Sequence, residues 1–151
     1  MKAFWLAILA AMLLLPSCAS KELNLPEPAE LFESVKAKVE LPEMDEVSGE
    51  YLNESTGVEE AEYSSAVHYI LSAGLAPDEI VIIKAKDSQT AGAIKEKLDK
   101  RLAYKEKSAE NYLTEYLPVI KKGLVRRDGL TVSLIVSEKV EEIEEVYDSF
   151  K

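Results

Sequence analysis

The spacing of apolar residues predicts two helices in the first part of the chain beyond its N-terminal segment. Residues 28–40 carry apolar side chains at every fourth position, which is typical of an amphipathic helix. Pro42 ends this helix, because proline removes a backbone donor and clashes with the preceding turn. Residues 46–57 predict a shorter helix that Gly57 closes in the left-handed conformation. The apolar positions of the first helix are Leu31, Val35 and Val39.

Alternation replaces helical spacing in residues 63–71, as in a strand whose successive side chains point to opposite faces. One face of this strand carries Tyr63, Ser65, Val67, Tyr69 and Leu71. A turn-like segment separates it from residues 79–86, EIVIIKAK, whose β-branched residues predict a second strand. Residues 123–137 contain two apolar runs around Asp128-Gly129. That pair favours a type I′ turn with positive φ at both positions, so the runs predict a second hairpin.

Two further helices complete the pattern. Asp87 or Ser88 caps a long helix whose apolar positions recur at intervals of three and four, and Pro118 ends that pattern. Ser137 caps a last helix with apolar residues inward and glutamates outward. The long seam comprises Ala91, Ile94, Leu98, Leu102, Ala109, Tyr112 and Tyr116, interrupted by Lys105. The inward residues of the last helix are Val140, Ile143, Tyr147 and Phe150.

This order of elements predicts an α+β fold. Strand pairs joined by tight turns, with helices between and around them, are typical of helices packed on an antiparallel sheet. We expect a four-stranded antiparallel sheet from two hairpins, with the long helix packed on one face and helices at both ends. The chain is long enough for one such domain and too short for two.

The N-terminal segment has the pattern of a secretory signal peptide. One positive charge, Lys2, precedes an uncharged and mostly apolar stretch from Ala3 to Ser20. The apolar part is too short for a comfortable membrane span, which needs about 20 residues; an uncleaved signal anchor remains the alternative. The residues at its end, Leu-Pro-Ser-Cys, resemble the lipobox of bacterial lipoproteins, with Cys18 as the acceptor. The resemblance implies a diacylglyceryl group on the Cys18 sulfur and cleavage before Cys18.

The predicted organisation therefore has three parts. Residues 1–17 are a lipoprotein signal peptide, residues 18–27 are the lipidated cysteine with a short tether, and residues 28–151 are a single extracytoplasmic α+β domain. Cys18 is the only cysteine, so no disulfide forms within the chain. The net charge of −10 argues against nucleic-acid binding, which requires clustered lysine and arginine. The expected partners are the membrane, through the lipid, and an envelope protein or ligand.

The chain also resembles a known family. The residues that carry this resemblance are the lipobox, EIVIIKAKDSQTAGAIKEKLDKRLAYKEKSAENYLTEYLP and the hairpin after it. They are similar to a family of small lipoproteins from Gram-positive bacteria, catalogued as a domain of unknown function (forty-three fifty-eight). The resemblance implies a membrane-anchored extracytoplasmic domain and supplies no activity, so it assigns no site except Cys18.

Residues able to carry catalysis are few. His68 is the only histidine, and its predicted strand favours a surface or edge-strand position. One histidine, no second cysteine and no calcium-loop pattern argue against a metal site, and no cofactor motif is present. Glu59 and Glu62 could form a glycosidase-type pair only if one lay in an apolar pocket. Their charged surroundings favour exposure instead.

Tyrosines are the more suggestive residues, because an aromatic ring with a polar tip suits an interface. A possible binding surface comprises Tyr63, Tyr69 and Tyr104, whereas we expect Tyr112 and Tyr116 in the core. The sequence predicts a lipoprotein anchored at the outer face of the cytoplasmic membrane, with a non-catalytic binding or accessory domain. A carboxylate-dependent envelope hydrolase is the alternative, and it requires a buried carboxyl group with a raised pKa. A third possibility is a passive spacer.

Overall fold

The computed structural model describes residues 25–74 and 77–150. Their five α-helices are α1 (Pro28–Lys38), α2 (Gly49–Thr56), α3 (Ser88–Tyr112), α4 (Leu117–Lys122) and α5 (Val140–Asp148). The strands are β1 (Met44–Glu46), β2 (Tyr63–Leu71), β3 (Glu79–Ala85), β4 (Leu124–Asp128) and β5 (Thr131–Val136). Two short 3₁₀ helices are η1 (Glu60–Glu62) and η2 (Thr114–Tyr116). The predicted signal peptide and Cys18 lie outside the described residues.

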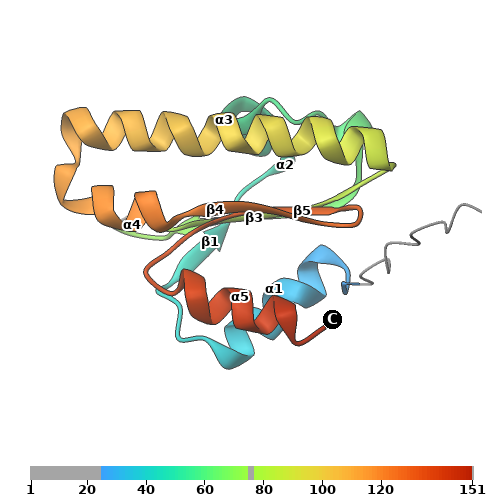
Figure 1. Ribbon diagram of the computed structural model, residues 1–151, viewed down its shortest axis with the longest axis horizontal. Coiled ribbons are helices and arrows are strands. Elements are labelled where there is room, and N and C mark those ends of the chain that lie inside the picture. The colour runs from blue at the N-terminus through green and yellow to red at the C-terminus, as the bar shows by residue number, and fades with distance from the viewer. Residues whose placement is uncertain (1–24, 75–76, 151) are drawn as a thin grey trace, which may run out of the picture.

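The strands form one antiparallel sheet in the order β1-β2-β3-β5-β4. The two predicted hairpins are present, and β3 pairs with β5 to join them. The sheet has five strands rather than the four expected, because β1 adds to the edge of β2. Figure 1 shows three layers, with α2 and α3 on one side of the sheet and α1 and α5 on the other.

The central strands β3 and β5 are buried on both faces, which accounts for their nearly continuous apolar sequences. In β3, Ile80 and Ile82 pack toward α1 and α5, whereas Val81 and Ile83 pack toward α3. Each face of the sheet therefore has its own core. The α1–α5 core also includes Phe32, Val35, Ile143 and Tyr147, and the α3 core includes Leu52, Ile94, Leu98, Ile120 and Leu134.

The long helix is shorter than its sequence pattern suggested. It ends at Tyr112, because Leu113 leaves the helical conformation with φ −139° and ψ 50°. Pro118 does not end it but lies in the first turn of α4, where its missing N–H is tolerated. The prediction that Tyr112 belongs to the core is wrong, since this side chain is 85% exposed. Tyr116 is partly buried against the α3 core.

The β4–β5 turn is shifted by one residue from its predicted position. Asp128 pairs with Thr131, so Gly129 and Leu130 form the two-residue loop. Gly129 has φ 62°, and no non-glycine residue in the described chain has positive φ. A glycine with positive φ at the first central position is the arrangement of a type II′ turn rather than the predicted I′.

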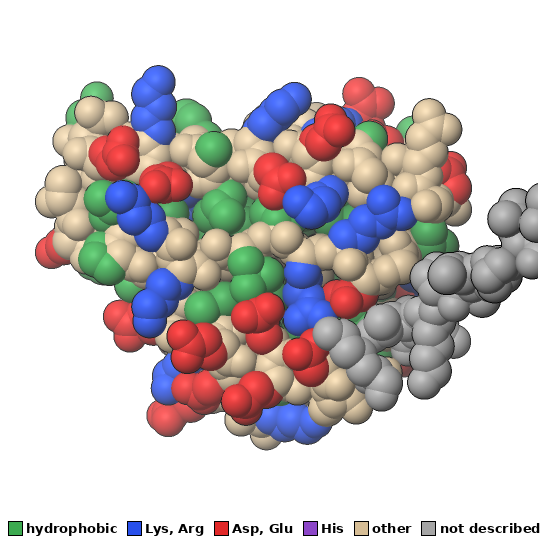
Figure 2. All heavy atoms as spheres, viewed as in Figure 1, with side chains coloured by type: hydrophobic (Ala, Val, Ile, Leu, Met, Phe, Trp, Pro, Cys, Tyr) green, Lys and Arg blue, Asp and Glu red, His purple; other side chains and the backbone are tan. Residues whose placement is uncertain are grey.

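Helices α2 and α5 follow the sequence more closely, although the N-cap of α5 is Lys139 rather than the predicted Ser137. Ser48 caps α2 by accepting a hydrogen bond from the Tyr51 backbone N–H, and Gly57 closes it at φ 74°. In α5, Ile143 and Tyr147 are buried while Glu141, Glu142 and Glu145 are exposed. Figure 2 shows acidic side chains gathered over the layer that contains α5. No helix within residues 25–74 and 77–150 is long and apolar enough to span a membrane.

Candidate functional site

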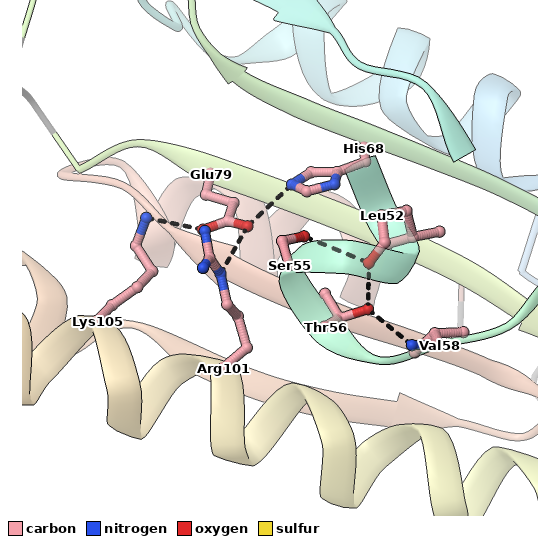
Figure 3. Close-up of polar contacts among 8 residues, drawn as sticks. All are labelled: Leu52, Ser55, Thr56, Val58, His68, Glu79, Arg101 and Lys105. Carbon is pink, nitrogen blue, oxygen red and sulfur yellow. Dashed lines mark hydrogen bonds and ion pairs between the residues drawn. The ribbon is translucent and has the colours of Figure 1, made fainter. Parts of the chain in front are cut away.

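A cluster of four ionisable side chains lies between the sheet and α3. Its centre is Glu79, the first residue of β3, which is completely buried. The Glu79 carboxylate contacts His68 Nε2 at 2.9 Å, Arg101 Nε and a terminal Arg101 nitrogen at 3.2 Å each, and Lys105 Nζ at 2.7 Å. Figure 3 shows these three partners converging on the carboxylate from β2 and α3. We call these four residues the Glu79 cluster.

Strand and helix periodicity explain why the cluster forms. Side chains alternate along β3, so Glu79 lies on the same face as Val81, toward α3. His68 is paired directly with Val81 on the neighbouring strand and therefore shares that face. Arg101 and Lys105 are four residues apart in α3, so they lie on one side of the helix, one turn from each other.

The environment keeps the Glu79 carboxyl group ionised. Burial alone would raise its pKa, but the hydrogen bond with His68 and the charges of Lys105 and Arg101 outweigh that effect. The pKa of Glu79 is therefore held well below its usual range. A buried charge is tolerated when it is paired and hydrogen-bonded, and Glu79 has both kinds of partner.

An ionised Glu79 defines the state of its histidine neighbour. A carboxylate only accepts hydrogen bonds, so Nε2 of His68 carries the proton and donates it. In the neutral ring, Nδ1 then has a lone pair and accepts. Nδ1 is buried and has no hydrogen-bond partner among the described residues, and the residue is 1% exposed. The prediction of a surface or edge-strand histidine is wrong, because β2 lies inside the sheet and α2 covers this face.

His68 also lines a hollow between β2 and the start of α2. This inner hollow has a volume of about 200 Å³ and adjoins an outer hollow of about 540 Å³. Gly49 and Tyr63 line both. The inner hollow is further lined by Glu46, Val47, Ser48, Leu52, Ala66, Val67 and His68. The outer one is further lined by Glu50, Asn53, Glu59 and Glu60.

The three tyrosines predicted to form a binding surface do not lie together. Tyr63 lines the hollows on the α3 side, whereas Tyr69 packs on the opposite side, stacked on Phe32 with ring centroids 3.6 Å apart. A register shift between Tyr63 and Ser65 breaks the expected alternation and separates the two rings. Tyr104 is 64% exposed on α3. Cys18, the predicted lipidation site, is outside the described residues.

The carboxylates considered for catalysis have other roles. Glu62 accepts a hydrogen bond from the Glu59 backbone N–H and pairs with Lys97 at 2.6 Å. The pKa of Glu62 is lowered, because this hydrogen bond and the Lys97 charge outweigh its burial. In the described part of the chain, no group of three or more histidine, cysteine or acidic residues is placed to hold a metal ion.

Sequence reasoning missed Glu79, Arg101 and Lys105 as a unit, although two signals were present. A glutamate opening a strand that is buried on both faces needs a cationic partner. Lys105 interrupts the apolar seam of the long helix, on the side that faces the sheet. Neither signal shows that Glu79 and Lys105 are partners, because the contact between them depends on how α3 crosses the sheet.

The fold and the Glu79 cluster define a three-layer α/β domain with an antiparallel sheet and a buried ionic centre. The chain belongs to the family described as Domain of unknown function (DUF4358), whose model matches residues 37–137. That match includes all five strands, the Glu79 cluster and both hollows. No curated protein and no solved structure matches the chain.

Proposed function

We propose that the protein is a bacterial lipoprotein, anchored through Cys18 at the outer face of the cytoplasmic membrane. Its folded domain is a non-catalytic binding or accessory module. The observation that carries the proposal is the Leu-Pro-Ser-Cys sequence ending at Cys18, directly after an uncharged apolar leader. The likeness to lipoproteins of Gram-positive bacteria is part of this proposal.

The anchoring chemistry needs only one residue. The Cys18 sulfur forms a thioether with the diacylglyceryl group of a phospholipid, whose phosphate head group leaves with the thiol proton. Hydrolysis of the peptide bond before Cys18 then releases the signal peptide. Two acyl chains, at about 0.8 kcal/mol per buried CH₂, hold a protein stably where one chain does not. Ten free residues reach at most about 35 Å when extended. Of the predicted tether, residues 18–27, Leu25 packs in the α1–α5 core, so the reach is shorter and the domain works close to the membrane.

The state of Glu79 does not suit this residue to the proton-donating role in hydrolysis. A carboxylate-dependent hydrolase needs a buried carboxyl group with a raised pKa that can donate a proton. The pKa of Glu79 is lowered instead, and its oxygens are occupied by three side chains. No observation on the described residues favours the hydrolase alternative.

The test is the intact mass of the protein extracted from bacterial membranes, compared with a Cys18→Ala variant. We expect a mass that lacks residues 1–17 and includes a diacylglyceryl adduct, with the adduct absent from the variant. The variant should also leave the membrane fraction. An unmodified protein in the medium would contradict the anchor and indicate a secreted domain.

A further inference from the structure

We infer that the two adjoining hollows between α2 and β2 bind a small organic amine in its protonated form. The inference rests on the proposed function, because it names the ligand class of that binding domain. Its basis is an outer hollow lined by three glutamates, next to an inner hollow lined by a buried histidine with one ring nitrogen unpartnered in the described part of the chain.

The outer hollow is suited to a cation. Three glutamates line it, Glu50 from the first turn of α2 and the pair Glu59 and Glu60 around η1. Asn53 donates its amide nitrogen to the Val58 carbonyl at 3.1 Å, which leaves its side-chain oxygen to accept. Among the described residues, no lysine or arginine lines either hollow. An anionic ligand such as a phosphate would be repelled here, whereas an ammonium group would be attracted.

The inner hollow supplies the second and independent observation. His68, which lines it, is 1% exposed, and its Nδ1 has no hydrogen-bond partner among the described residues. Figure 3 shows Nδ1 on the side of the ring away from Glu79, turned toward α2, whose Leu52 lines the same hollow. A buried acceptor left unpaired is costly, so a ligand N–H that reaches it gains a favourable bond. Tyr51 lies beside the imidazole, with the two ring centroids 5.6 Å apart, and is 38% exposed.

The passage between the hollows limits the size of the ligand. Gly49 lies at the junction, and a Cβ there would be 3.4 Å from the Tyr63 hydroxyl oxygen. The absence of a side chain at Gly49 therefore leaves room beside Tyr63. An inner volume of about 200 Å³ suits a short aliphatic chain rather than a nucleotide or a sugar chain. An ammonium group has three donors and no acceptor, which suits the three glutamate carboxylates and the Asn53 side-chain oxygen.

The experiment titrates the full chain, solubilised in mild detergent, with 1,4-diaminobutane, and uses 1,4-butanediol as the neutral control. Binding is measured by calorimetry and by the ¹⁵N resonances of His68, which are assignable because the chain has one histidine. We expect saturable binding of the diamine, a shift of the Nδ1 resonance and no binding of the diol. Equal binding of the two, or no saturation, would overturn the inference.

Matched variants distinguish binding in the hollows from non-specific attraction of a cation to an acidic protein. The double variant Glu59→Gln/Glu60→Gln should weaken diamine binding at least tenfold. Glu54→Gln, an exposed change on α2 outside both hollows, should leave it unchanged. Equal weakening by Glu54→Gln would overturn the inference. Circular dichroism confirms that each variant is folded.

A peptide with a single lysine distinguishes a small-molecule amine from the lysine side chain of a protein partner. Binding of that peptide without binding of the free diamine would overturn the small-molecule assignment and indicate a protein partner. The outcome is independent of the anchor, because the lipid adduct on Cys18 is read by mass alone. Failure of amine binding and failure of lipidation are therefore distinguishable.

Discussion

The Glu79 cluster contains more positive than negative charge. One carboxylate meets two fixed cations, Arg101 and Lys105, as well as the His68 imidazole. Arg101 and Lys105 keep 15% and 17% of their side-chain surface exposed, which lessens the cost of desolvating them. The Glu79 side chain is 0% exposed, so water does not reduce the cost of burying its charge. The stability of this region therefore depends on Glu79 remaining ionised.

The substitution Glu79→Gln tests that dependence. It leaves two buried cations without their counter-charge, so we expect a loss of about 3–5 kcal/mol in unfolding free energy at pH 7. The Glu79 pKa is lowered in the folded protein, so its contribution is complete above the ordinary value of 4.5 and is lost as the pH falls further. The difference in unfolding free energy between the parent protein and Glu79→Gln should therefore decrease between pH 5 and pH 3.

Urea unfolding followed by circular dichroism at pH 7, 5 and 3 measures this difference. Glu27, Glu62 and Asp87 also have lowered pKa values, but they are present in both proteins and cancel in the comparison. A gap that stays constant from pH 7 to pH 3 would show that the carboxylate charge is not what stabilises the cluster.

Single residues were the hardest features to predict from the sequence. Strict alternation along the strand places Tyr63 and Tyr69 on the same face. The register shift after Tyr63 puts the two side chains on opposite faces of the sheet. His68 lies in an alternating strand sequence that does not show which face is covered, and its burial comes from α2 and from Glu79, eleven residues away. Such outcomes depend on bulges and long-range contacts, to which local periodicity is insensitive.

At the scale of elements, local signals identified the helices and hairpins but not all of their ends. Gly57 closes α2 as the sequence indicates, whereas the predicted start at residue 46 gives way to a cap at Ser48. In contrast, β1 has only three residues, Met-Asp-Glu, without an apolar alternation, and exists because it pairs with β2. A strand that depends wholly on its partner leaves no trace in its own sequence.

The β4–β5 hairpin gives a direct test of element-scale reasoning. Gly129 has φ 62°, a conformation that costs an ordinary L-residue about 1–2 kcal/mol. Gly129→Ala should therefore lower the unfolding free energy by about that amount, whereas Gly129→Asn should cost less, because asparagine tolerates positive φ. Thermal and urea unfolding of the two variants and the parent protein measure which variant is the less stable. Equal stability of the alanine variant and the parent would contradict the assigned turn.

At the scale of the molecule, the sequence predicted antiparallel hairpins and a helix on one face, but not their assembly. The two hairpins join through β3 and β5, whose apolar runs carry no information about which strand is the neighbour. The α1–α5 layer is equally non-local, since it brings both ends of the domain to one face of the sheet. Burial of β3 and β5 on both faces is the physical reason for this third layer.

This architecture predicts one cooperative unit despite its two cores. Leu98 lies in the α3 core and Ile143 in the α1–α5 core, and both are completely buried. Leu98→Ala and Ile143→Ala should each cost about 2–5 kcal/mol through lost burial and a residual cavity. Because the two residues lie in different cores on opposite faces of the sheet, the destabilisation of the double variant should equal the sum of the single changes within about 0.5 kcal/mol.

The strands shared by the two cores determine whether the cores unfold together. Since β3 and β5 contribute side chains to both cores, neither layer can melt while the sheet keeps the other intact. Unfolding of each variant should therefore remain a single transition, with the far-ultraviolet signal of the helices coinciding with the near-ultraviolet signal of the tyrosines. Separate transitions in Ile143→Ala would mean that α1 and α5 form an independently unfolding layer on a sheet that α3 alone can hold.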